Sequence, residues 1–178
     1  FEFEKTPLSE ETADQVKGCE GLIILTNCHV TEPVAKTLAA NGVKYIACRS
    51  AGSDHVDYAA VTKYGMQCAH VPAYAPEAIS EHTVMLALEV LRHAKLCARK
   101  VEEGDFTMAG LKGRQLGNLT AGVLGTGRIG RVTMSILNGF GTKVLGWDPF
   151  PNDAAAKLCT YVEKEELLKT ADIVFLHC

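Results

Sequence analysis

Three glycines at fixed spacing are the residues whose chemistry is most readily inferred from this sequence. The segment Gly125-Thr126-Gly127-Arg128-Ile129-Gly130 has the pattern G-x-G-x-x-G and follows the short apolar run 120–124. In such a turn the first glycine permits a tight bend, the second lets the backbone approach a pyrophosphate, and the third lets a helix pack closely on a sheet. The N–H groups at the start of that helix, at Arg128 and Ile129, would attract an anion, and Arg128 could add a charge contact.

A strand before the turn and a helix and a strand after it must position these glycines. Apolar spacing predicts the helix over 129–137, and the strand 143–147 follows it and ends at Asp148. Asp148 lies 18 positions after Gly130 (148 minus 130), where an acidic residue binds the adenosine ribose 2′-hydroxyl. A carboxylate at that place repels the 2′-phosphate of NADP, so the predicted cofactor is NAD. The alternative interpretation is a tight strand-helix turn that binds no ligand.

The composition is that of an ordinary globular chain, with 178 residues, 47% hydrophobic and 22% charged. The net charge is −3, and there is no basic run and no apolar stretch of membrane-spanning length, so we expect neither nucleic acid nor membrane as a partner. Seven cysteines form no C-x-x-C pair, which favours a reducing cytoplasm and argues against a metal site.

Strands and helices alternate along the chain, which predicts parallel sheets covered by helices on both faces. A stiff segment with two prolines, 71–76, is predicted to be a hinge, followed by one long helix from Pro76 to Lys100. The expected domains are residues 1–73, a hinge and interdomain helix at 74–103, and residues 104–178. The chain opens without Met and closes in an apolar strand, so we expect both domains to be truncated. Strands are predicted at 1–4, 21–26, 43–48, 66–71, 120–124, 143–147 and 173–177, and shorter helices at 9–17, 31–41, 56–64 and 164–169.

Four stretches and one acidic residue form an ordered set along the chain: RSAGSDHVD (49–57), VPAYAPEAISEHTV (71–84), GVLGTGRIGRV (122–132), Asp148 and ADIVFLHC (171–178). In sequence and in order they resemble the NAD-dependent D-2-hydroxyacid dehydrogenases, most of all the D-lactate and D-2-hydroxyisocaproate group. The resemblance implies a flavodoxin-like substrate domain and a Rossmann coenzyme domain. It also implies a homodimer that transfers a hydride between NAD(H) and a D-2-hydroxy acid/2-oxo acid pair, D-lactate and pyruvate or a longer-chain analogue.

By position, the backbone amides of Ala51 and Gly52 resemble those that hold the substrate carboxylate in this family. Tyr74 resembles a tyrosine that faces the substrate and the nicotinamide, and the alternative is a tyrosine that packs the hinge. His177 and Cys178 fall where the third nucleotide strand passes the cofactor, which implies contacts through the backbone. A nucleophilic role for this pair is disfavoured, because no third group near it would activate the thiol.

The family's catalytic arginine, acid and histidine lie beyond position 178. No catalytic residue is therefore assigned in this stretch, and we expect the stretch alone to be inactive. Glu81 and His82 are interpreted as a polar pair that joins the long helix to neighbouring loops, and the alternative is that Glu81 acts as a base. Arg49 is interpreted as a partner of Asp54 or Asp57, and the alternative is a contact with the substrate. The alternative function is an NAD-responsive binding protein, similar to the transcriptional corepressors that share this fold.

Overall fold

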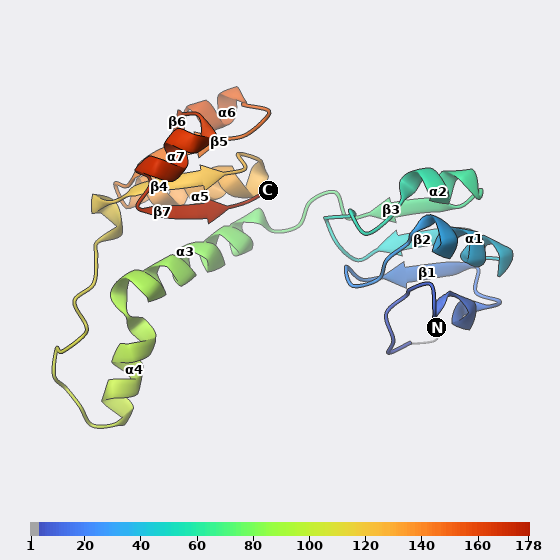
Figure 1. The fold of residues 1–178 in the computed structure, drawn as a ribbon, viewed down its shortest axis with the longest axis horizontal. Helices are drawn as coiled ribbons and strands as arrows, with labels where there is room; N and C mark the ends of the chain where they lie inside the picture. The colour runs from blue at the N-terminus through green and yellow to red at the C-terminus, as the bar shows by residue number, and fades with distance from the viewer. Residues whose placement is uncertain (1–3) are drawn as a thin grey trace. The chain divides into compact units, whose positions relative to one another are not determined.

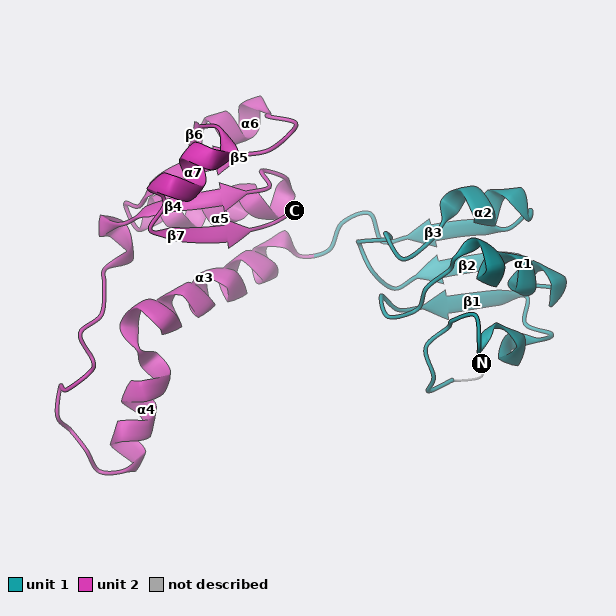
Figure 2. Cartoon of the chain, viewed as in Figure 1, with its two compact units in different colours: residues 1–74 teal, residues 75–178 magenta. Residues whose placement is uncertain are grey.

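The computed structural model describes residues 4–178 and divides into two compact units, Phe1–Tyr74 and Ala75–Cys178 (Figure 2). Each unit contains its own parallel sheet (Figure 1). The predicted strand at 1–4 falls almost wholly outside the described residues. Over residues 4–178, no helix combines the length and the apolar character that crossing a membrane requires.

The first unit is a three-stranded parallel sheet in the order β1-β2-β3, with two α-helices and a short 3-10 helix. The predicted helix at 9–17 is present only as a turn, in which the carbonyl oxygen of Ser9 accepts hydrogen bonds from the backbone N–H groups of Thr12 and Ala13, followed by the 3-10 helix. The elements in chain order are the 3-10 helix Ala13–Val16, β1 Gly21–Ile24, α1 Glu32–Ala40, β2 Tyr45–Cys48, α2 Tyr58–Lys63 and β3 Gln67–His70.

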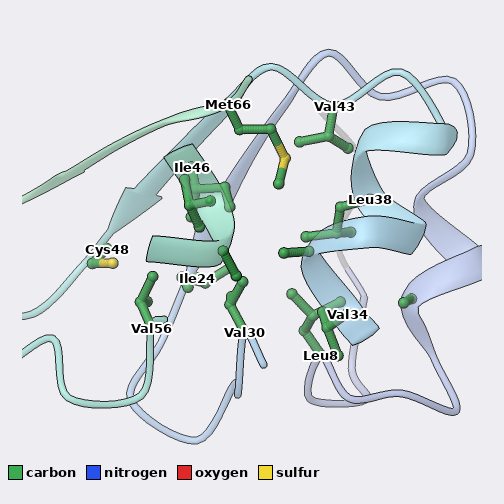
Figure 3. Packing of buried hydrophobic residues seen from close by; sticks show 14 residues of the cluster. Leu8, Ile24, Val30, Val34, Leu38, Val43, Ile46, Cys48, Val56 and Met66 are labelled. Atoms are coloured by element: carbon green, nitrogen blue, oxygen red, sulfur yellow. The ribbon is translucent and has the colours of Figure 1, made fainter. Parts of the chain in front are cut away.

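The core of the first unit lies between its helices and one face of its sheet (Figure 3). Val34 and Leu38 of α1 pack in one cluster with Ile24 and Ile46 of the strands, and all four are buried. Strand residues of the opposite face are exposed, as in Ile23 at 67%. Among the described residues, the helices therefore cover only one face of this sheet, where the alternation predicted cover on both.

The second unit has a four-stranded parallel sheet in the order β6-β5-β4-β7. The predicted bounds of β4 and β5 are confirmed. The elements in chain order are α3 Pro76–Arg92, α4 Ala94–Glu102, a 3-10 helix Leu116–Asn118, β4 Thr120–Leu124, α5 Arg128–Gly139, β5 Lys143–Trp147, α6 Asp153–Ala156, β6 Thr160–Tyr161, α7 Lys164–Thr170 and β7 Ile173–Leu176.

The single long helix predicted from Pro76 to Lys100 is wrong, because the chain bends at His93. This residue has φ of 53° in the left-handed region and separates α3 from α4. The carbonyl oxygen of Leu91 accepts a hydrogen bond from the backbone N–H of Arg114 at 3.0 Å, and the ring Nε2 of His93 lies 3.2 Å from the carbonyl oxygen of Lys112. The returning segment thus takes over a carbonyl that a continuous helix would use.

Helices cover both faces of the second sheet. On one face, Met134 and Leu137 of α5 and Val84 of α3 pack against the β4 residue Val123. Met134, in the middle of the predicted helix 129–137, is fully buried. On the other face, the buried Leu167 of α7 lies so close to β4 that a Cβ at Gly122 would be 2.4 Å from its Cδ2. This unit is therefore doubly wound.

Candidate nucleotide-binding site

The carboxyl ends of three neighbouring strands bring the predicted coenzyme residues together within the second unit. From β4 the chain proceeds to β5 and β6 on one side and then crosses to β7 on the other. The N–H of Gly125 donates to the carbonyl oxygen of Trp147 at 2.9 Å, and that of His177 donates to Leu124 at 2.7 Å. In open α/β sheets, such a reversal of strand order leaves a crevice at the carboxyl edge where ligands bind.

Two of the three glycines in the turn are required by close backbone packing. Gly125 has φ of 90°, and a Cβ there would lie 2.4 Å from the carbonyl oxygen of His177. A Cβ at Gly130 would lie 2.0 Å from the carbonyl oxygen of Gly125. These distances confirm the predicted tight turn and the close approach of α5 to the sheet.

The middle glycine faces open space. Gly127 precedes α5 as its N-cap with extended backbone, and a Cβ built on it meets no atom within 4 Å. The residue is exposed, and so is the neighbouring Arg128. The first N–H groups of the 12-residue helix α5 have no partner within the helix. This open helix start therefore fits a pyrophosphate, whose charge the helix dipole favours.

Asp148 directs its carboxylate back onto the turn. Its Oδ2 accepts hydrogen bonds from the backbone N–H of Thr126 at 2.6 Å and from the Thr126 hydroxyl at 3.1 Å, and its Oδ1 accepts from the N–H of Phe150 at 2.9 Å. The N–H of Thr126 contributes most to lowering the pKa of Asp148 below its usual value, against the opposing effect of burial. The carboxylate beside the turn is therefore ionised at neutral pH.

His177 continues β7 beside the turn, with its side chain directed toward α5. Its Nε2 lies 2.9 Å from the hydroxyl oxygen of the fully buried Thr133. Burial lowers the pKa of His177, which favours the neutral imidazole. Cys178, the next residue, is an exposed free thiol. Over residues 4–178, no group of three or more His, Cys, Asp or Glu side chains is arranged to hold a metal ion.

The substrate-binding candidates Ala51, Gly52 and Tyr74 belong to the first unit. Ala51 and Gly52 lie in the exposed loop after β2. The carbonyl oxygen of Gly52 accepts a hydrogen bond from the Ser50 hydroxyl at 2.7 Å, and that of Ala51 lies 3.0 Å from Nδ1 of His70. These contacts hold the loop by its carbonyl groups, and a Cβ at Gly52 would meet no atom within 4 Å.

One side chain of the first unit agrees with neither of its predicted partners, and another lacks the contacts of its alternative interpretation. Tyr74 is 75% exposed, so its ring does not pack within its own unit as the alternative held. Arg49, predicted to pair with Asp54 or Asp57, forms no ion pair with any residue in the described part of the chain. Asp57 instead accepts a hydrogen bond from the backbone N–H of Ala60 at 2.9 Å and caps α2.

The sequence did not predict the polar side chains behind the turn. Asn152 and Tyr161 both reach Thr126, and Ser80 of α3 donates to the carbonyl oxygen of Ile129 at 3.0 Å. Asn152 had a sequence signal, because asparagine before a helix start is a preferred N-cap. Tyr161 and Ser80 had none, since their partners are distant in the sequence.

The strand order and the glycine turn define the second unit as an α/β unit of the dinucleotide-binding type. A family model described as "D-isomer specific 2-hydroxyacid dehydrogenase, catalytic domain" matches residues 1–177. The chain therefore belongs to the D-isomer specific 2-hydroxyacid dehydrogenase family.

Individual relatives agree with this assignment. The chain is 39% identical to a D-lactate dehydrogenase of Escherichia coli over all of its own length and 54% of the relative's. It is 40% identical to an aromatic 2-oxoacid reductase of Clostridium sporogenes over 93% of this chain and 50% of the relative. The structure of a D-lactate dehydrogenase from Aquifex aeolicus complexed with NAD and lactic acid matches with a TM-score of 0.85 and 32% identity, over 98% of this chain and 51% of that one. The chain thus spans about half the length of these relatives.

Proposed function

We propose that this chain contributes the NAD site and part of the substrate site of a D-2-hydroxyacid dehydrogenase. The observation that carries the proposal is a glycine turn whose middle residue, Gly127, faces open space beside the ionised carboxylate of Asp148. Membership of the family and the relative complexed with NAD and lactic acid support it. The proposed substrates are D-lactate and pyruvate, or a longer-chain pair.

In this proposal, each part of the carboxyl edge of the sheet has one task. The N–H groups at Gly127, Arg128 and Ile129 hold the pyrophosphate, and Asp148 accepts hydrogen bonds from the adenosine ribose. The backbone at His177 and Cys178 passes beside the cofactor. When bound, NAD supplies the hydride chemistry.

The first unit contributes the substrate contacts. The backbone amides of Ala51 and Gly52 bind the carboxylate of the 2-oxo acid, since a loop held by its carbonyl groups can offer its N–H groups to an anion. Tyr74 faces the substrate, for which its exposed ring is available. The cation that polarises the substrate carbonyl and the proton donor are expected beyond residue 178, in keeping with the catalytic arginine, acid and histidine of the family.

Two further properties belong to the same proposal. We expect the whole protein to act as a homodimer in the cytoplasm. All seven cysteines are free thiols in the structure, which is compatible with a reducing compartment.

The test is NADH oxidation by the whole protein in the presence of pyruvate, 2-oxoisocaproate, phenylpyruvate and 2-oxoglutarate, with NADPH as the comparison. The proposal predicts turnover with at least one of these acids and a preference for NADH. If NADH binds but no 2-oxo acid is reduced, the corepressor-like alternative replaces the enzyme. A protein that binds no dinucleotide would contradict both.

A further inference from the structure

Thr126, the residue between the first two glycines of the turn, has a fully buried side chain at the centre of a polar network. Its hydroxyl oxygen lies 2.6 Å from the hydroxyl oxygen of Tyr161, 3.1 Å from Oδ2 of Asp148 and 3.2 Å from Nδ2 of Asn152. These partners come from β6, the end of β5 and the N-cap of α6. A tight turn alone does not require a hydroxyl at this position, so the network calls for a separate explanation.

The donors and acceptors fix the direction of every hydrogen bond in the network. Oδ1 of Asn152 caps α6 by accepting from the N–H of Ala155 at 2.9 Å, which directs its amide nitrogen toward Thr126. The backbone N–H of Asn152 donates to the Tyr161 oxygen at 3.2 Å. The Asp148 carboxylate can only accept. The Tyr161 hydroxyl therefore donates to Thr126, and the Thr126 hydroxyl donates to Asp148.

This chain of donors ends on the one side chain that would contact the adenosine ribose. Asp148 Oδ2 receives both the N–H and the hydroxyl of Thr126, and Oδ1 receives the N–H of Phe150. A carboxylate held by three donors keeps one position and its negative charge. Loss of these hydrogen bonds leaves the Asp148 carboxylate with fewer donors. The carboxylate is then freer to rotate away from a 2′-phosphate.

We propose that Tyr161 and Asn152, acting through Thr126, are positioning residues that set the preference of this site for NAD over NADP. The inference rests on the proposed function, because it assigns the network a role toward the same cofactor. Discrimination between the two cofactors depends on a repulsive group held in place. A carboxylate that can turn aside would repel the 2′-phosphate less and bind the 2′-hydroxyl less well.

The chain contains its own reporter for the test. Trp147 is the only tryptophan of the sequence, immediately precedes Asp148 and is half-buried. Dissociation constants for NADH and NADPH can be measured on the whole protein from the quenching of tryptophan fluorescence, to which Trp147 contributes. The quantity of interest is the ratio of the NADPH constant to the NADH constant.

Thr126→Val removes the central hydroxyl, and Tyr161→Phe removes the donor behind it while keeping the ring. We expect the ratio to fall about fivefold or more in Thr126→Val and about twofold to threefold in Tyr161→Phe. Thr126→Ser, which retains the hydroxyl, is expected to keep most of the wild-type ratio. The matched control is Thr142→Val, because the buried Thr142 hydroxyl donates to the carbonyl oxygen of Leu116 at 3.1 Å, outside the network. That variant is expected to lose stability and keep the ratio.

An unchanged ratio in folded Tyr161→Phe and Thr126→Val, or an equal fall in Thr142→Val, overturns the inference. If Thr126→Val does not fold, Tyr161→Phe and Thr126→Ser decide the question. If the wild-type whole protein binds neither dinucleotide, both the proposed function and this inference are overturned. NADH binding with an unchanged ratio in the variants would overturn the inference alone.

Discussion

Gly127→Ala should weaken NADH binding strongly while changing the free energy of unfolding very little. Gly127 has φ of −65° and ψ of −158°, an extended conformation outside the left-handed region that favours glycine, and its Cβ would meet no atom within 4 Å. Replacing glycine in a compatible conformation gains about 0.4–1 kcal/mol through the unfolded chain. Alanine is a poorer N-cap than glycine by a similar amount. We therefore expect the free energy of unfolding to change by less than about 0.5 kcal/mol.

Binding should respond strongly to the same methyl group. The methyl would occupy the space from which the N–H groups at the start of α5 reach a phosphate. Loss of one hydrogen bond to a charged group costs about 1.5–3 kcal/mol, which corresponds to a rise of about 10- to 140-fold in the dissociation constant. The assay is titration with NADH followed by Trp147 fluorescence, alongside urea unfolding of the same variant.

Gly139→Ala is the matched control, since Gly139 ends α5 and a Cβ there also meets no atom within 4 Å. It makes the same chemical change at the far end of the helix, so NADH affinity should be unchanged. If folded Gly127→Ala binds NADH as tightly as the wild type does, the turn does not hold the pyrophosphate. A loss of stability well above 1 kcal/mol would show that the space beside Gly127 is filled.

Three further outcomes follow from the packing and charge of the second unit. Gly130→Ala should lower the free energy of unfolding by about 1–3 kcal/mol in urea unfolding, and NADH affinity with it, because its Cβ would lie 2.0 Å from the carbonyl oxygen of Gly125. Leu137→Ala should cost about 2–5 kcal/mol in the same assay, since it empties a fully buried site in the core. Burial lowers the pKa of His177 from its usual 6.5, so below about that pH the unfolded chain binds more protons than the folded chain does. The free energy of unfolding should therefore fall as the pH drops below about 6.5. His177→Gln should reduce this dependence of the free energy of unfolding on pH, measured by urea unfolding between pH 5 and 7.5.

Each of these outcomes can contradict the packing or charge that predicts it. An unaffected Gly130→Ala would mean that α5 does not approach the turn as closely as the glycine spacing implies. A cost below 1 kcal/mol for Leu137→Ala would place that side chain outside the core. An equal pH slope in His177→Gln and the wild type would assign the acid sensitivity to other groups.

The part of the fold that the sequence predicted best is the part held by local patterns. The apolar runs of β4 and β5 end at glycine and at Asp148, and their bounds are confirmed. The glycine turn was predicted equally well, because its three glycines have the fixed spacing of the G-x-G-x-x-G motif. The structure confirms this at Gly125 and Gly130.

The features that the sequence did not predict depend on contacts between distant segments. The break at His93 requires Arg114 to donate to Leu91, 23 positions earlier (114 minus 91). The network at Thr126 requires β6 and the start of α6 to meet behind the turn, which no periodicity indicates. The exposed face of the first sheet, which includes Ile23, could not be inferred either. A short apolar run is found both in strands buried on two faces and in strands buried on one face.

The most direct test of the central claim is the affinity of the wild-type chain and of Asp148→Ala for NADH and NADPH. The account predicts that the wild-type chain binds NADH more tightly than NADPH. It also predicts that Asp148→Ala weakens NADH binding and narrows the gap, because the ribose contact and the repulsion of the 2′-phosphate depend on one carboxylate. Unchanged NADH affinity in a folded Asp148→Ala variant would contradict the proposed role of Asp148 in binding. Asp148 would then only end β5 and hold the turn through its hydrogen bonds with Thr126.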